Sequence, residues 1–447
     1  MRIKGFAPAA GLCLLALAGA ATAQNAPAPA PRPARAGPPA EPALGDGPWD
    51  YQTIDANVHV EVVTRGLDHP WGMAFLPDGS IMVTERPGRL RLVRRGKLDP
   101  QPIEGLLPVY ATGISGLTDV LLDPDFARNH YVYLAYSKPS PNTPPGTNPN
   151  VADAAAAVMR GTWDGGHRLT DVKDIWASNE WYGKPPLAPK CCGQGPASGS
   201  FGGRLATDGK YLFITSGDRN YGERVQDPNS DFGKILRLNF DGSVPRDNPW
   251  VGRKGMKATV WSTGHRNQLG LYWDAPTRRL WESEFGPRGG DEINLITKGG
   301  NYGWIDVTQG HHYNGEPSHK GIRGVPGFID PVWAFPPSGN PGNLVIYRGA
   351  MFPGWQGDML LPNMTRPPSL LHMKLAADGH FVAMETLLQP LGQRLRDVRV
   401  APDGSVYLLT DETQGAILRL SRGPDTPPTA PGRPAAAVAR PASPGGG

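Results

Sequence analysis

The sequence has little charge and almost no cysteine. Asp, Glu, Lys and Arg make up 19% of its 447 residues, and 45 basic residues nearly balance 41 acidic ones. Several of the basic residues stand in the two terminal segments, so the folded part is not a polycation. Nucleic acid and anionic membranes are therefore not expected as partners.

Long uninterrupted helical segments are also lacking, because turn-forming residues occur throughout. The 58 glycines and 49 prolines make up roughly a quarter of the chain. This content excludes a helical bundle and a coiled coil. It is typical of many short strands joined by many turns.

The N-terminus predicts an export signal over residues 1–23. Arg2 and Lys4 precede an apolar run from Leu12 to Ala20, and Ala21-Thr22-Ala23 is a small-x-small cleavage pattern. The run is too short to span a bilayer, and no later stretch is predicted to do so. A buried hydrophobic helix is the alternative. We expect an exported, periplasmic protein.

Two terminal segments and one internal segment have low complexity. Residues 24–49 and 423–447 are rich in Ala and Pro and have few large apolar groups, which predicts disorder. The folded part is then 50–422. Residues 137–157 are predicted to form a long surface loop between strands.

A repeated hairpin pattern carries the fold prediction. In each copy a strand, a tight turn of Asp-Gly type and a second strand follow one another. The copies are centred on Asp78-Gly79, Asp208-Gly209, Asp403-Gly404 and, more loosely, Asp123-Pro124 and Asp274-Ala275. Five such hairpins predict an all-β fold in which small sheets are arranged radially, a β-propeller. A large β-sandwich is the alternative.

Three motifs contain residues suited to chemistry: Gly264-His265-Arg266-Asn267, the segment EFGPRGGDEINLI of residues 284–296, and Arg394-Leu395-Arg396-Asp397. A guanidinium beside an amide offers donors to carbonyl or carboxylate groups. Carbonyls near a Gly-Pro pair, with an Asp and a Glu close by, suit a hard cation such as Ca²⁺; a salt-bridged loop is the alternative. Two arginines on one face of an extended segment can bind a polyanion or can simply be solvated.

Taken together and in this order, the motifs resemble the soluble quinoprotein sugar dehydrogenases, the glucose/sorbosone and aldose sugar dehydrogenase family. The resemblance runs from about Gly66 to Leu420. It rests on GLDHPWGMAFLPDG, LDPDF, KILRLNFDGSVPRDNPW, GHRN, GPRGGDEINLI, NYGW and RLRDVRVAPDG. It implies a six-bladed propeller that binds pyrroloquinoline quinone (PQQ), a tricarboxylate o-quinone, together with Ca²⁺.

The resemblance also implies roles for single residues. Arg266 and Asn267 would contact the quinone, with Arg266 near the reacting atoms, and Arg394 and Arg396 would bind the quinone carboxylates. Arg366 stands where the family has a lysine, and Tyr313 matches a tyrosine that contacts the quinone. The carbonyls of Gly286 and Pro287 would hold the cofactor Ca²⁺. Glu292 and Tyr302 match a second, structural Ca²⁺ site.

Two positions depart from the family pattern. Ser200 stands where the family has the histidine that acts as general base, and Ile114 stands where it has a glutamine that contacts the quinone. Serine does not accept a proton unaided at neutral pH. We therefore expect a different base: Asp218, reaching the substrate directly or through a water held by Ser200. Glu223, His311 and His312 are further candidates.

Two cysteines remain after the expected signal cleavage, the adjacent Cys191 and Cys192. In an oxidising compartment they could close a vicinal disulfide, or they could be inert or metal-binding thiols. Larger alcohol-oxidising quinoproteins carry such a disulfide and use an aspartate base, which is an analogy only.

The sequence thus predicts an exported PQQ- and Ca²⁺-dependent dehydrogenase of a sugar or another alcohol. Without a CxxCH haem motif, its electrons would pass to a separate carrier, a cytochrome or a quinone. A non-catalytic propeller that serves as a binding module and a Ca²⁺-dependent lactonase-type propeller are the alternatives.

Overall fold

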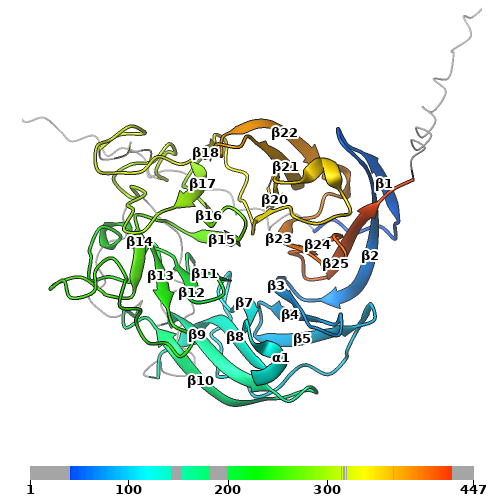
Figure 1. The fold of residues 1–447 in the computed structure, drawn as a ribbon, viewed down its shortest axis with the longest axis horizontal. Helices are drawn as coiled ribbons and strands as arrows, with labels where there is room; N and C mark the ends of the chain where they lie inside the picture. The colour runs from blue at the N-terminus through cyan, green and yellow to red at the C-terminus, as the bar shows by residue number, and fades with distance from the viewer. Residues whose placement is uncertain are drawn as a thin grey trace, which may run out of the picture. The chain divides into compact units, whose positions relative to one another are not determined.

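The short strands expected from the turn-rich sequence assemble into six sheets around a common axis (Figure 1). The computed structural model describes residues 41–141, 154–181, 199–313, 315, 318, 320–365 and 367–424. Within them the sheets form the six blades of a β-propeller, which confirms the predicted fold. No helix in this part of the chain is long and apolar enough to cross a membrane.

The first three blades follow one another along the chain, each an antiparallel sheet of four strands. Blade 1 contains β3 (Pro70–Phe75), β4 (Ile81–Glu85), β5 (Arg89–Arg94) and β6 (Lys97–Leu98). Blade 2 contains β7 (Leu117–Leu122), β8 (Tyr131–Pro139), β9 (Ala154–Trp163) and β10 (Leu169–Ala177), with the one-turn helix α1 (Phe126–Asn129) between β7 and β8. Blade 3 contains β11 (Gly202–Thr207), β12 (Leu212–Ser216), β13 (Lys234–Leu238) and β14 (Val260–Thr263).

The last three blades complete the ring. Blade 4 contains β15 (Gln268–Asp274), β16 (Arg279–Glu284), β17 (Asp291–Ile296) and β18 (Trp333–Phe335). Blade 5 contains β19 (Val345–Ile346), β20 (Met359–Asn363), β21 (Ser369–Leu375) and β22 (Phe381–Leu387). Blade 6 contains β23 (Leu395–Val400), β24 (Val406–Thr410), β25 (Gly415–Arg422) and two strands from the N-terminal side, β2 (Asn57–Leu67) and β1 (Trp49–Gln52).

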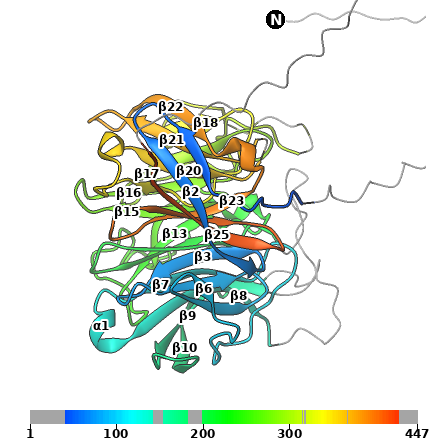
Figure 2. The ribbon, with the colours of Figure 1, turned by 90° about the vertical axis from the view of Figure 1, so that its right-hand side faces the viewer.

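Blade 6 closes the ring by joining the two ends of the folded chain. Strand β2 pairs with β25 in antiparallel register, with Val60 opposite Leu420, and the two run side by side in Figure 2. The chain contacts this region ahead of residue 50, since the carbonyl of Pro42 accepts a hydrogen bond from Gln393. This pairing places the two ends of the folded chain in one sheet.

Asp-Gly turns explain why the hairpin repeat is visible in the sequence. In the β3–β4 turn, the Asp78 carboxylate accepts the backbone N–H of Ser80, and Gly79 has a φ of 82° that favours glycine. Asp208 and Asp403 form the same bond two residues on in blades 3 and 6. All five predicted hairpins are the first two strands of blades, which confirms them.

The hydrophobic core lies between successive blades. Six clusters of buried apolar side chains each combine residues of two neighbouring sheets. In one of them Tyr133 and Val158 of blade 2 pack against Leu205 and Leu236 of blade 3. Every blade therefore depends on both neighbours for its burial, which makes the ring cooperative.

The segment expected to be a long loop over residues 137–157 is partly strand. Strand β8 continues to Pro139 and β9 begins at Ala154, and these two residues pair with each other. Buried alanines over Ala154–Ala157 extend the hairpin. A run of alanines has no marked strand propensity, so only its tertiary pairing reveals it.

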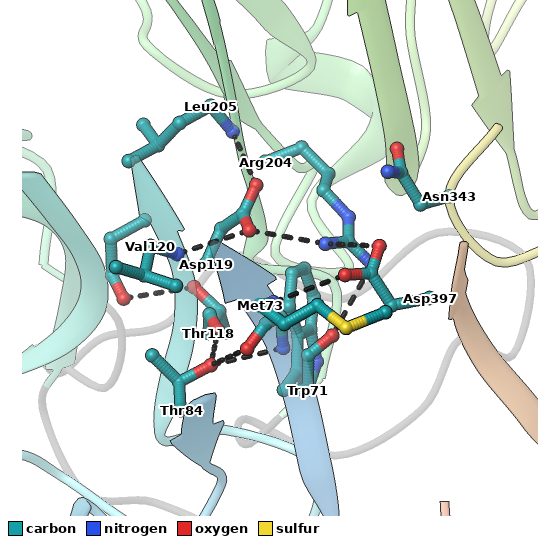
Figure 3. A network of polar contacts seen from close by, with 12 residues as sticks. Trp71, Met73, Thr84, Thr118, Asp119, Val120, Arg204, Leu205, Asn343 and Asp397 are labelled. Atoms are coloured by element: carbon teal, nitrogen blue, oxygen red, sulfur yellow. Dashed lines mark hydrogen bonds and ion pairs between the residues drawn. The ribbon is translucent and has the colours of Figure 1, made fainter. Parts of the chain in front are cut away.

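A buried ionic network occupies the centre of the ring (Figure 3). The Arg204 guanidinium lies 3.2 Å from the carboxylate of Asp119 and 3.1 Å from that of Asp397. Its Nε donates to the carbonyl of Leu269, and its plane lies 4.1 Å from the ring centroid of Trp71. These contacts connect the innermost strands of five blades beneath the functional site.

Candidate functional site

A cleft of about 630 Å³ opens among the loops that connect the strands of blade 4. It has the size of a small-molecule site. The residues that line it are Arg266, Phe285, Gly286, Pro287, Arg288, Gly289, Gln309, His311, Tyr313, Pro336, Pro337, Ser338 and Asn340. None of these is acidic, and two are arginines, so the cleft favours an anionic ligand.

Arg266 is the central polar group of this cleft. It follows β14, and its Nη1 donates to the carbonyls of Phe285 and Gly286 at 2.9 and 2.8 Å. Its Nη2 donates to the Tyr313 hydroxyl at 3.4 Å. The neighbouring amide oxygen of Asn267 accepts the N–H of Gly202. The structure thus brings together Arg266, Tyr313 and Gly286, three residues that the sequence predicted for the site.

The Gly286–Pro287 turn is held by a buried carboxylate. Asp291 accepts the N–H of Gly286 at 2.8 Å and the Ser338 hydroxyl at 2.9 Å. Ser338 in turn donates to the Pro287 carbonyl. The carbonyls of Gly286 and Pro287 are therefore fixed on the wall of the cleft, each with a second lone pair beyond its present hydrogen bond.

Asp218 and Ser200 lie together, as the sequence predicted, but beneath the surface. The Asp218 carboxylate is fully buried, and its two oxygens accept the N–H of Asn220 at 2.9 Å and the indole N–H of Trp304 at 2.8 Å. Burial raises the pKa of Asp218, against the opposing influence of Arg266 and of hydrogen bonds from Asn220, Trp304 and Ser200. Neither Asp218 nor Ser200 lines the cleft.

A second cationic group surrounds Asp411 near the axis. Arg394 and Arg396 both donate to its Oδ2, at 3.2 and 2.5 Å, and Arg86 lies 3.7 Å from Oδ1. Burial alone would raise the pKa of Asp411, but the guanidinium of Arg396, aided by Arg394 and Arg86, holds it well below the ordinary value. The prediction that the two arginines share one face is confirmed.

The two arginine groups border a common apolar floor. Trp71, Leu269 and Met364 form a buried cluster against which Phe285 packs. Arg266 donates to the carbonyl of Phe285, and Arg394 donates to the carbonyl of Met364. Both guanidinium groups thus donate to the backbone beside one apolar cluster, a combination that suits an anion with an apolar body.

An acidic cluster lies behind the cleft, where β16 and β17 pair. Glu284 is the Cα partner of Glu292, and Glu282 faces Asn294. All three carboxylates are buried, and among the described residues no lysine or arginine forms an ion pair with any of them. Burial first, and the mutual repulsion of the carboxylates second, raise the pKa of Glu284; burial likewise raises those of Glu282 and Glu292.

Several buried acceptor atoms in this cluster have no hydrogen-bond partner among the described residues: Glu282 Oε1, Asn294 Oδ1 and Gln268 Oε1, together with His265 Nδ1. One ligand atom each from His265, Glu282 and Glu284 lies within 4.8 Å of the others. Unpaired buried charges of one sign are costly unless a cation neutralises them. The cluster therefore has the composition of a cation site.

Tyr302 contributes to this cluster through its ring. The ring stacks on His265 with centroids 4.8 Å apart, and its hydroxyl donates to the Leu295 carbonyl at 2.6 Å. Burial lowers the pKa of His265 to about 3, with a further contribution from Lys234. Because the Tyr302 phenol already donates to the Leu295 carbonyl, only the backbone carbonyl of Tyr302 is left to act as a metal ligand.

Three predicted positions lie outside the described residues: Arg366 and the pair Cys191 and Cys192. Ile114 is largely exposed, at 55%. Glu223 is exposed in the short 3₁₀ turn Gly222–Arg224, and it does not line the cleft.

Sequence reasoning missed the partners of the predicted groups. Glu282, Glu284 and His265 extend the predicted Glu292 site, and Asp411 and Arg86 complete the arginine group. One signal was available: Glu282 and Glu284 alternate in one strand, which places both on one face. Asp411 gave no local signal, because its partners lie on other strands.

Comparison with known proteins gives consistent matches over most of the chain. The family described as Glucose / Sorbosone dehydrogenase matches residues 67–419. The aldose sugar dehydrogenase YliI of Escherichia coli (strain K12) is 37% identical over 372 residues, which cover 82% of this chain and 93% of that protein.

Solved structures agree. The apo-form of the soluble aldose sugar dehydrogenase of Escherichia coli has a TM-score of 0.73 at 36% identity, covering 82% of this chain and 100% of that one. The PQQ-bound aldose sugar dehydrogenase of Streptomyces coelicolor has a TM-score of 0.62 at 26% identity, covering 82% and 98%.

Proposed function

Because the chain belongs to the glucose/sorbosone dehydrogenase family, we propose that it is a PQQ- and Ca²⁺-dependent dehydrogenase that oxidises a sugar or another alcohol. The observation that supports this most strongly is the arrangement of Arg266 and the Arg394–Arg396 pair on either side of an apolar floor, beside a cleft without acidic residues. A tricarboxylate matches the positive charge of this region.

The residues that would hold the quinone follow from this geometry. Arg394 and Arg396 carry more positive charge than Asp411 neutralises, so they can bind carboxylates. Arg266 and Asn267 would contact the quinone ring from the opposite side, with the Tyr313 ring next to the Arg266 guanidinium. When bound, PQQ supplies an o-quinone that accepts hydride from the alcohol carbon.

Calcium is proposed at two places. The carbonyls of Gly286 and Pro287, fixed by Asp291 and Ser338, offer hard oxygen ligands at the wall of the cleft. The acidic cluster of Glu282, Glu284 and Glu292 would hold a second ion, supported by its unpaired acceptor atoms. There the carbonyl of Tyr302, rather than its phenol, would contribute.

Asp218 remains a prediction as the base. Its contact with Ser200 supports a link between the two residues, but its carboxylate is covered by Trp304. In the geometry described here it can act on a substrate only through Ser200 and water. Its direct role is to orient Trp304 and Ser200 at the edge of the site.

Export and the electron acceptor are further parts of the proposal. The pattern of residues 1–23 supports a periplasmic location, which cell fractionation tests directly. A separate cytochrome or quinone would take the electrons. If the protein stayed in the cytosol after expression in a Gram-negative host, the proposed location would be wrong.

A non-catalytic binding propeller is the second candidate, favoured by Ser200 in place of a base. A dye-reduction screen separates the two. The protein loaded with PQQ and Ca²⁺ is offered aldoses, primary alcohols and secondary alcohols. Substrate-dependent dye reduction supports the dehydrogenase, and quinone binding without reduction by any substrate supports the binding module.

A further inference from the structure

The cleft contains one described side chain of a type that exchanges protons near neutral pH. Its ionisable residues are Arg266, Arg288, His311 and Tyr313. A guanidinium stays protonated, and a phenol ordinarily keeps its proton well above pH 7. Imidazole is the side chain that ordinarily changes its protonation between pH 5 and 8. His311 is therefore the remaining candidate for proton transfer within the described lining.

The backbone fixes His311 to the wall of the cleft. Its N–H and carbonyl exchange two hydrogen bonds of 3.0 Å with Arg288, in the loop that also carries Gly286 and Pro287. His311 and Tyr313 both line the cleft, whereas His312 between them is fully buried with its ring 5.4 Å from that of Trp304. This alternation is that of an extended segment, and it places His311 on the same side as Tyr313.

The charged neighbours of His311 come from three loops. Arg266 precedes β15, and Arg288 lies between β16 and β17. Tyr313 stands two residues after His311 in the same loop. Tyr313 lies beneath both guanidinium groups, with Arg266 and Arg288 5.7 and 5.9 Å from its ring centroid. No acidic group lines the described wall, so a proton taken up by His311 is not captured by a carboxylate there.

The alternative acceptor is less accessible. Asp218 is fully buried, and both of its oxygens already accept hydrogen bonds. Ser200 is buried next to it and cannot hold a proton. The position at which the family places a histidine is thus without a base, while His311 lines the same cleft as Arg266.

We propose that His311 accepts the substrate's hydroxyl proton, an inference that rests on the proposed dehydrogenase function and deepens it. The O–H bond of the alcohol breaks, and its proton goes to an imidazole nitrogen of His311. The carbon–oxygen double bond forms as the C–H hydrogen leaves with its two electrons, as hydride, to the o-quinone. The proton on His311 is then released to solvent, which the exposed cleft admits.

The first test is kinetic. His311→Gln should lower kcat by a hundredfold or more and remove the acidic limb of the kcat–pH profile, while quinone affinity stays unchanged. His380→Gln changes an exposed histidine in the β21–β22 turn and should leave both unaffected. Ser200→His in the His311→Gln background should restore part of the turnover by returning a base to the position at which the family has its histidine.

The second test needs no cofactor. In the apoprotein, the imidazole resonances of His311, assigned by their loss in His311→Gln, should shift when a substrate sugar is added at high concentration. The buried His312 should not respond. This readout stays informative if no sugar reduces the quinone, an outcome that would overturn the proposed function but not the placement of His311.

Two results would overturn the inference. One is a normal kcat and a normal pH profile in His311→Gln, whatever the activity of Asp218→Asn. If Asp218→Asn then lost activity, the base would be Asp218. The other is an imidazole of His311 whose resonances do not shift with any aldose of the dye-reduction screen.

Discussion

At the scale of single residues, the functional site depends on unequal numbers of opposite charges. Around Asp411 three guanidinium groups face one carboxylate, and in the blade 4 cleft two arginines face none among the described residues. Behind the cleft the imbalance is reversed, with three buried glutamates close together. Each imbalance is costly by itself and is relieved by a ligand of opposite charge.

Removing the arginine charges should weaken quinone binding. Arg394→Ala should lower the affinity at least about tenfold, and the double change with Arg396→Ala by more, because a charge-assisted hydrogen bond contributes about 1.5–3 kcal/mol. A titration of the apoprotein followed by quinone absorbance measures this. Arg419→Ala removes a surface arginine paired with Glu61 and Asp403, and it should leave the affinity unchanged. Equal affinities in all variants would refute the placement.

A pH-dependent contribution to stability is expected from Lys234. Burial lowers its pKa to about 7, although Glu180, Asp231 and Asp227 oppose the shift. Below pH 7 both states are protonated and the folded state carries the full penalty. Between pH 7 and about 10, only the unfolded state keeps the proton, so the penalty diminishes as pH rises.

The matched variant is Lys234→Met. From pH 7 to 10 the wild-type free energy of unfolding should rise relative to that of the variant, by at most about 1.4 kcal/mol per pH unit. Urea unfolding at several pH values measures it. If the free energies of unfolding of the wild type and the variant changed in parallel over this pH range, Lys234 would have an ordinary pKa.

How much of the site the sequence reveals depends on whether residues act locally. Arg394 and Arg396 alternate on one strand, so their common face follows from sequence alone. The depth of Asp218 could not be predicted, because it is set by Trp304, 86 residues further along the chain. The pairing of the arginines with Asp411 could not be predicted either, because Asp411 belongs to a different segment of the chain.

At the scale of elements, the first two strands of each blade carry the recognisable pattern. Asp-Gly turns reveal three blades, because the Asp side chain and the positive φ of glycine stabilise a tight connection, and looser Asp turns reveal two more. Blade 5 was missed. Its strands β19 and β20 are joined instead by a longer segment with the 3₁₀ turn Pro353–Trp355, where Tyr347, Phe352 and Trp355 pack together.

The innermost strands should lose stability when their central ion pairs are broken. Arg204→Leu leaves Asp119 and Asp397 buried with only Arg399 as a partner, which should reduce the free energy of unfolding by about 3 kcal/mol or more. Arg419→Ala, at an exposed pair, should change it by less than about 1 kcal/mol. Urea denaturation of both variants compares them, and a near-neutral Arg204→Leu would show that the network is dispensable.

At the scale of the whole molecule, stability and ligand binding are coupled. Every blade packs against two others, and the β2–β25 pairing joins the chain ends, so local changes are felt around the ring. The cation site lies at blade 4, and the arginine group joins blade 6 to Arg86 of blade 1. Ligands at these places bind only the folded ring and therefore stabilise all of it.

Calcium should accordingly raise the melting temperature. The effect should follow mass action, since calcium at 100 times its Kd adds about 2.7 kcal/mol. Glu282→Gln with Glu292→Gln should abolish most of the response, because both changes remove anionic ligands. Differential scanning calorimetry with calcium and with chelator measures it. Identical melting curves for the wild type under the two conditions would rule out calcium at the acidic cluster.

The central claim is that this propeller uses its arginine-bordered cleft to reduce a bound quinone with electrons from a sugar. The most direct measurement is the absorbance spectrum of the protein loaded with PQQ and Ca²⁺, recorded anaerobically while aldoses are added one at a time. At least one sugar should convert the bound quinone to its reduced form, with one oxidised sugar formed per quinone. A quinone that binds stoichiometrically and stays oxidised with every aldose and alcohol tested would contradict it.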